Sequence, residues 1–251
     1  MKKEEIGHHF LARLGKTRLR PGGKVATDWL IANGDFRKDK KVLEVACNMG
    51  TTAIEIAKQF GCEVIGVDLD EEVLEKARHN VAENDVAELV KVQRANATRL
   101  PFDDNSFDIV INEAMLTMLP NEAKKKAISE YLRVLKPNGL LLTHDVLLNT
   151  EDTEQLLDQL RDAINISVTP LTKDAWKETF LSCGFRNVET FTGEMSLLSP
   201  KGLIYDEGVI GAMKIIGNAL KAENRETFKK MFKTFNDPEH KLGFIAICSQ
   251  K

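Results

Sequence analysis

Short apolar runs alternate with longer amphipathic segments between residues 41 and 144. The short runs are typical of buried strands, whereas the longer segments have the 3.6-residue spacing of helices. The pattern predicts strands at 41–46, 62–68, 89–94, 107–112 and 139–144, and helices at 52–60, 71–84 and 121–135. Such alternation favours a Rossmann-like, doubly wound α/β fold, in which helices cover both faces of a mostly parallel sheet.

The segments on either side of this core, which we place at 40–150, are largely helical in pattern. Residues 1–36 form a predicted N-terminal cap, and its helix from about Lys24 ends at Asn33-Gly34. The preceding Arg20-Pro21-Gly22-Gly23 fits a surface turn as well as a loop that folds over a ligand. Beyond residue 150 the sequence predicts helices near Thr153–Ile164 and at 173–183, and strands at 188–192 and 242–248.

Residues 193–239 carry apolar side chains at helical spacing. These are Val209, Ile210, Met213, Ile216, Leu220, Phe228, Met231, Phe232 and Phe235. Because predicted strands flank the segment, we expect a helical insertion within one domain spanning 1–251. Its apolar face fits either ordinary core packing or a lid over a substrate. The lysines between 221 and 233 are expected on a solvated surface.

Composition narrows the class of partner. The chain has 251 residues and a net charge of −3, which gives no electrostatic argument for nucleic acid. The first residues do not resemble a secretory signal, and no apolar stretch approaches the roughly 20 residues that span a bilayer, so integral membrane contact is not expected. Four scattered cysteines lack metal or disulfide spacing. We therefore expect a cytoplasmic protein without a metal site.

Residues 42–50 predict a ligand site, because a buried strand is followed by a tight loop and a helix that Thr51 or Thr52 can cap. The loop has only Gly50 where a dinucleotide site has G-x-G-x-x-G, which argues against a nicotinamide-dependent oxidoreductase. The strand carries Glu44 near its end. An acid at this place suits a cationic ligand better than a pyrophosphate.

Polar side chains follow the next strands at the edge where ligands bind in such sheets. Asp68 can accept hydrogen bonds from both hydroxyls of a ribose, and Asn96 with the backbone of Ala97 can read the edge of adenine. Each also has a structural explanation: Asp68 can cap a helix and Asn96 can stabilise a turn. Glu113 fits cofactor contact, substrate contact or plain solvation.

The fifth predicted strand ends at His144-Asp145, where an acceptor is expected to lie. Either side chain can supply a general base, although a histidine there can also have a purely structural role. The sequence leaves open whether a base is used at all.

Four motifs, in this order and spacing, resemble the class I S-adenosylmethionine-dependent methyltransferases, and the small-molecule branch most closely. They are Val42–Gly50, Val64–Asp68, Asn96-Ala97 with Leu100–Asp108, and Arg133–Gly139. The resemblance implies seven strands with an antiparallel C-terminal strand. It also implies that Ala46, Cys47, Asn48 and Gly50 pack against the methionine part of the cofactor, that Asp68 holds the ribose and that Leu69 lines the adenine slot. Ala46 and Asn48 stand where the family usually has glycine.

The implied activity is methyl transfer from S-adenosyl-L-methionine to a small-molecule acceptor by in-line displacement. The altered loop and the lack of an obvious base leave a second hypothesis open, a cofactor-binding sensor or scaffold without turnover. The sequence indicates neither the methylated atom nor the oligomeric state.

Overall fold

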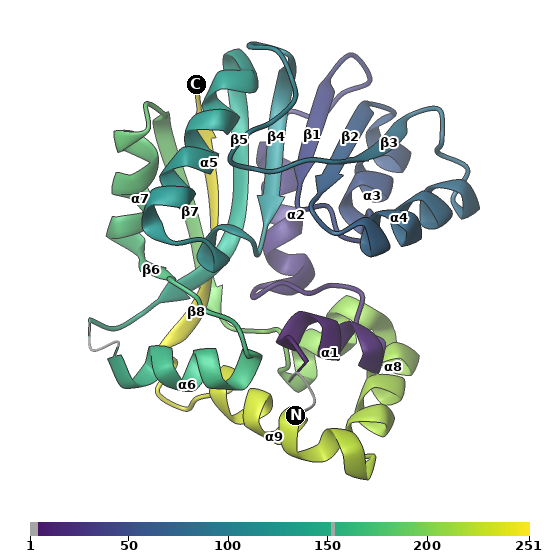
Figure 1. Ribbon diagram of the computed structural model, residues 1–251, viewed down its shortest axis with the longest axis vertical. Helices are drawn as coiled ribbons and strands as arrows, with labels where there is room; N and C mark the ends of the chain where they lie inside the picture. Colours follow the sequence, from purple (N-terminus) through teal and green to yellow (C-terminus); the bar gives the residue numbers. More distant parts are fainter. Residues whose placement is uncertain (1–4, 152–153) are drawn as a thin grey trace.

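One twisted sheet forms the centre of the molecule in the computed structural model, which describes residues 5–151 and 154–251 (Figure 1). The predicted helix start at Thr153 and the first four residues of the predicted cap lie outside these ranges. The strands are β1 (Lys41–Val45), β2 (Glu63–Asp68), β3 (Val90–Arg94), β4 (Phe107–Glu113), β5 (Leu135–Leu148), β6 (Leu171–Thr172), β7 (Arg186–Glu194) and β8 (Leu242–Gln250). They are ordered β3-β2-β1-β4-β5-β8-β7, and β6 pairs with β5. The first five strands are parallel, and β8 runs antiparallel to both of its neighbours.

Helices cover both faces of the sheet. On one face, α5 (Asn121–Val134) and α7 (Lys173–Ser182) bury Tyr131 and Trp176 against β1, β4 and β5. On the other face lie α2 (Gly23–Asn33), α3 (Thr51–Phe60) and α4 (Glu71–Glu83). The central strands are buried from both sides, which explains why their sequences are apolar without alternation.

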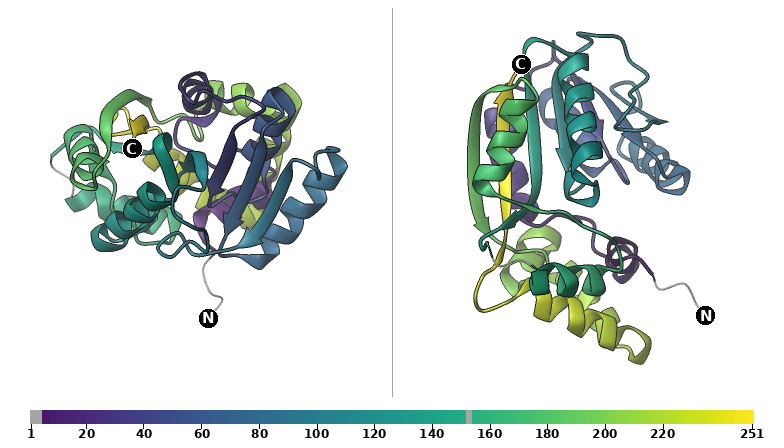
Figure 2. Two further views of the ribbon diagram at one scale, coloured as in Figure 1. Left: turned by 90° about the horizontal axis from the view of Figure 1, so that it is seen from above. Right: turned by 60° about the vertical axis from the view of Figure 1, so that its left-hand side comes forward.

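A third helical group lies beyond the carboxyl ends of the parallel strands (Figures 1 and 2). It consists of α1 (Gly7–Leu14), α6 (Glu154–Ile164), α8 (Pro200–Ala219) and α9 (Ala222–Phe235), which share a separate apolar cluster. Segments from both ends of the chain therefore meet over the edge of the sheet where ligands bind in this class of fold. No helix among the described residues is long and apolar enough to cross a membrane.

The predicted mostly parallel sheet with an antiparallel C-terminal strand is confirmed. Two details differ from the prediction. The short strand β6 was not predicted, and β5 begins at Leu135, directly after α5, instead of at residue 139. Asn138 takes a left-handed conformation (φ 64°), and the register against β4 shifts nearby, so the start of β5 is irregular.

Core packing, one of the two explanations given for the apolar face of 193–239, does not hold for the main positions on α8. Val209, Ile210, Met213 and Leu220 are exposed, with Ile210 reaching 85% exposure. The helix packs inward through a different face, which carries Ala212, Ile215 and Ala219. Because α8 is apolar on both sides, its periodicity alone does not indicate which side packs.

Candidate functional site

A cavity of about 270 Å³ lies at the carboxyl ends of β1, β2, β3 and β4. Nine of the ten predicted cofactor-binding residues line it: Glu44, Ala46, Cys47, Asn48, Asp68, Leu69, Asn96, Ala97 and Glu113. Gly50, the tenth, lies outside the lining, immediately before α3. The parallel sheet brings these residues together although up to 69 positions separate them in the sequence.

Three residues of the loop after β1 have a left-handed backbone conformation: Ala46 (φ 58°), Asn48 (φ 48°) and Gly50 (φ 75°). Ala46 and Asn48 thus adopt the conformation that glycine takes most easily, at a cost of about 1 kcal/mol for alanine. Two hydrogen bonds to β2 hold the loop: Cys47 N–H donates to the Val67 carbonyl, and Asn48 N–H donates to the Asp68 carboxylate at 3.0 Å each.

Glu44 lies beneath this loop, buried at the N-terminus of α3. Its Oε2 accepts a hydrogen bond of 2.9 Å from Ala53 N–H in the first turn of the helix. Neither Thr51 nor Thr52 caps the helix, because the N-cap residue is Gly50, which has no side chain, so that prediction is wrong. Burial raises the pKa of Glu44 to about 8, against the attraction of Arg20. The free protein therefore carries Glu44 mostly protonated at pH 7.

The wall opposite the loop contains the residues expected to bind a nucleoside. Asp68 accepts Asn48 N–H through one carboxylate oxygen and Asp70 N–H, at 3.1 Å, through the other. Leu69 is 56% exposed and lines the cavity. The side-chain oxygen of Asn96 accepts hydrogen bonds of 2.9 Å from the backbone and hydroxyl of Thr98, which fixes the orientation of its amide.

Glu113, at the end of β4, is the centre of a buried polar network. Its carboxylate pairs with Arg20 at 2.8 Å and accepts hydrogen bonds from the hydroxyls of Thr27, at 2.6 Å, and Thr52, at 3.1 Å. His144 lies opposite in the register of β5, with Nδ1 3.0 Å from Oε2. Burial alone would raise the pKa of Glu113, but Arg20 and His144 outweigh it and lower the pKa to about 2.

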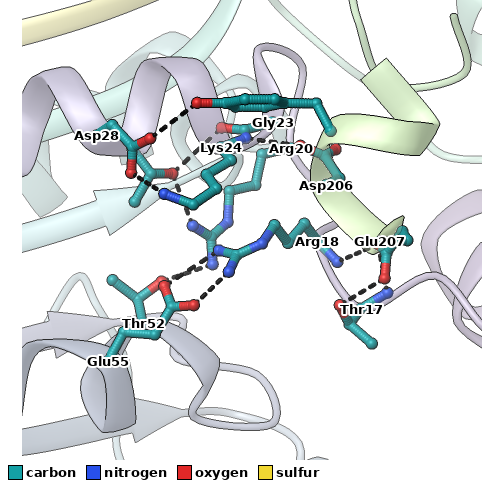
Figure 3. Close-up of polar contacts among 12 residues, drawn as sticks. Thr17, Arg18, Arg20, Gly23, Lys24, Asp28, Thr52, Glu55, Asp206 and Glu207 are labelled. Atoms are coloured by element: carbon teal, nitrogen blue, oxygen red, sulfur yellow. Dashed lines mark hydrogen bonds and ion pairs between the residues drawn. The ribbon is translucent and has the colours of Figure 1, made fainter. Parts of the chain in front are cut away.

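The segment between α1 and α2, residues 15–22, is here called the strap. Figure 3 shows its two arginines pointing toward α3, where Arg18 pairs with Glu55 and Arg20 donates to Thr52. From the other side α8 holds the strap: Asp206 pairs with the fully buried Lys16 at 2.9 Å, and Glu207 accepts hydrogen bonds from the backbone of Thr17 and Arg18. The sequence left two interpretations of Arg20–Gly23 open, a surface turn and a loop that folds over a ligand. The structure is consistent with the second, because Arg20 lines the cavity.

The two predicted catalytic residues lie in different surroundings. His144 is fully buried and does not line the cavity; its Nε2 accepts a hydrogen bond of 2.8 Å from Gly22 N–H and its Nδ1 faces Glu113. Both ring nitrogens thus have protein partners. Asp145 is also buried, and its oxygens accept N–H groups of Thr117 (3.1 Å) and Val146 (2.8 Å). Burial raises its pKa despite these bonds.

A second, apolar cavity of about 80 Å³ adjoins the first. Asp145 lines it together with apolar side chains from α1, α6 and α9, including Leu11, Leu160, Met231 and Phe235. The two cavities share four lining residues: His8, Leu19, Ala114 and Met118. Burial lowers the pKa of His8, and its Nδ1 has no hydrogen-bond partner among the described residues.

Sequence reasoning missed several residues of this site. Thr27 and Thr52 hold Glu113, and Thr117 and Met118 belong to a short 3₁₀ helix, Leu116–Met118, between the cavities. Nothing in their local sequence indicated these roles, because the contacts depend on how the strap crosses the sheet. Only Arg20 was indicated by its local sequence, because it precedes Pro21-Gly22-Gly23, a segment that fits a loop over a ligand.

Comparison with known proteins identifies the family. The family described as "Methyltransferase domain" matches residues 42–139. A protein of Haemophilus influenzae, whose description names no activity, is 73% identical over the full length of both chains. A ubiquinone/menaquinone biosynthesis C-methyltransferase of Stutzerimonas stutzeri is 31% identical, covering 77% of this chain and 79% of its own. Two demethylmenaquinone methyltransferases match over only about half of their length.

The fold itself is shared with a solved structure. Phosphoethanolamine N-methyltransferase 2 of Haemonchus contortus, solved with S-adenosylhomocysteine, superposes with a TM-score of 0.77 at 19% identity, covering 98% of this chain and 57% of that one. The strand order, the loop after β1, the acid at the end of β2 and these similarities have one common explanation. The chain belongs to the class I S-adenosylmethionine-dependent methyltransferases.

Proposed function

We propose that this protein binds S-adenosyl-L-methionine in the larger cavity and transfers its methyl group, by in-line displacement, to a small and mainly apolar acceptor held in the second cavity. The observation that carries the proposal is the shared wall of His8, Leu19, Ala114 and Met118. A donor and an acceptor in adjoining cavities can meet there without leaving the protein.

The residues of the larger cavity fit the donor. Asp68 is an acceptor for vicinal hydroxyls at the end of β2, and each of its oxygens keeps a lone pair beyond the backbone bond that it accepts. Leu69 offers an apolar surface for a base. Glu44 can balance the charge of an amino group, and the left-handed loop lets backbone approach the ligand closely.

The second cavity supports an acceptor that is apolar apart from its reacting end. Its lining is largely aliphatic and aromatic, and its titratable groups among the described residues are His8 and Asp145. Burial raises the pKa of Asp145, which makes its carboxylate a stronger base than a carboxylate in water. Two of the similar proteins are named as methyltransferases of menaquinone or ubiquinone biosynthesis, and a quinone with an apolar tail would be an acceptor of this kind.

The donor, when bound, supplies an already activated methyl group. The contribution of the chain is therefore alignment and the exclusion of water. Leu19 of the strap and Met118 form part of the wall that both cavities share, and Asp145 receives a proton if the acceptor atom carries one. His144 has a positioning role in this account, since it links Gly22 of the strap to Glu113.

Asp68 is expected to determine cofactor affinity. Asp68→Ala should weaken S-adenosylhomocysteine binding at least about tenfold, because two hydroxyl partners and the anchor of the loop are lost. The control Asp70→Asn should change affinity by less than about threefold, because asparagine at position 70 can still cap the N-terminus of α4. Titration calorimetry measures both. Unchanged binding by Asp68→Ala, or no binding by the wild type, contradicts the proposed cofactor site.

Glu44 should make cofactor binding depend on pH. Its pKa is about 8 in the free protein, and a bound amino cation favours the ionised form. S-adenosylhomocysteine affinity should therefore rise from pH 6 to pH 8, by at most about tenfold per unit, with release of a proton. Glu44→Gln, which can still accept Ala53 N–H, should remove this dependence. An equal slope in the variant would assign the proton to another group, such as His8, which also lines the cavity.

Asp145 is expected to act on the acceptor and not on the donor. Asp145→Asn should lower the transfer of labelled methyl into an organic extract of bacterial cells by about a hundredfold, while S-adenosylhomocysteine affinity stays within about threefold. His144→Gln should instead weaken S-adenosylhomocysteine binding, because the strap loses an anchor. Full turnover by Asp145→Asn contradicts its assigned role. Labelled product from the wild type excludes a sensor without turnover.

A further inference from the structure

The part of α8 after Gly208 presents an apolar stripe to solvent. Gly208 is not helical (φ 70°, ψ 171°), and it separates the part of α8 that holds the strap from the part that carries the stripe. The most exposed side chains are Ile210 (85%), Met213 (67%), Val209 (61%) and Leu220 (59%). Single exposed apolar residues are ordinary, but a cluster of them on one element is typical of an interaction surface.

The spacing of these residues places them on one side of the helix. Val209, Met213, Ile216 and Leu220 follow one another at intervals of four, three and four, and Ile216 is 43% exposed. Ile210 extends the stripe along one flank. An adjacent side of the helix is already used, since Ala212, Ile215 and Ala219 pack into the helical group. The exposed stripe is therefore a second apolar face, and no described residue covers it.

Basic side chains outnumber acidic ones along α8 after Gly208 and along α9, in a protein that is acidic overall. Between Val209 and Phe235 there are six lysines and arginines and only two acids, whereas the whole chain has a net charge of −3. Lys214 and Lys221, seven positions apart, lie on the flank of α8 next to Ile210. On α9, Arg225 and Lys229 share a side with Phe232, which is 37% exposed.

We propose that this face of α8, with the basic side of α9, docks on an anionic lipid bilayer. An amphipathic helix that lies in the bilayer interface needs an apolar stripe to insert and flanking cations to meet the lipid phosphates. Self-association through the same face is less favourable, because a two-fold contact brings the lysines of both copies together. Charge therefore selects an anionic surface over a second copy of the chain.

Docking there also brings the second cavity to the bilayer. Met231 and Phe235 of α9 form part of its wall, so the helical group that meets the lipid is the group that encloses the acceptor. An apolar acceptor can then enter without crossing bulk water. The docking itself does not depend on the proposed methyl transfer, because it rests on the exposed stripe and its charges.

Vesicle flotation tests the proposal. Wild-type protein should float with phosphatidylcholine vesicles that contain about one third phosphatidylglycerol, and poorly with phosphatidylcholine alone. Ile210→Asp/Met213→Asp and Lys214→Glu/Lys221→Glu should each reduce the floated fraction roughly tenfold, and high salt should reduce wild-type binding. The matched control is Leu181→Asp on α7, where Leu181 is 43% exposed but lies outside this face. Thermal unfolding should show that all variants remain folded.

Two results would overturn the proposal. The first is equal flotation of the wild type and the Ile210→Asp/Met213→Asp variant, or no flotation at all. The second is a wild-type dimer in sedimentation that the same double substitution dissociates, together with no binding to anionic vesicles. That second result would assign the stripe to a second copy of the chain.

Discussion

The buried ion pair between Arg20 and Glu113 is the interaction on which the site depends. It joins the strap to the end of β4, and Thr27, Thr52 and His144 complete its hydrogen bonds from α2, α3 and β5. Removing both charges from water is costly, and the pair is tolerated because nearly every polar atom around it has a partner. Its consequence is geometric: a segment that would otherwise be a surface connection forms a wall of both cavities.

Two buried acids in the same cavity have pKa values shifted in opposite directions, because their surroundings differ. Glu113 is held ionised by Arg20 and has a pKa of about 2, whereas Glu44 forms no ion pair among the described residues and burial raises its pKa to about 8. The first is therefore a permanent structural anion, and the second is a carboxyl that a bound cation can ionise. Environments that push the pKa values of neighbouring acids apart are characteristic of functional sites.

The lining of the larger cavity could be predicted from sequence because strand ends alone place its residues. Glu44, Asp68 and Asn96 each follow a recognisable strand, and the parallel sheet brings such positions to one edge. The strap, the inward face of α8 and the partners of His144 could not be predicted in this way. They depend on contacts between distant segments, such as Gly22 with His144 and Lys16 with Asp206, which are more than 100 residues apart. Periodicity also carries no information about which of two apolar faces is buried.

Hydrogen exchange of an Arg20→Met variant, read together with its S-adenosylhomocysteine affinity, tests the central role of this ion pair. With Glu113 left without its cation, amides of residues 16–22 should exchange at least about tenfold faster, and β1 and β2 should stay protected. The ligand should bind at least about tenfold more weakly. The variant Arg20→Met/Glu113→Gln, which leaves no unpaired charge, should remain stable yet show the same loosened strap. Unchanged protection of the strap with unchanged affinity would contradict the account.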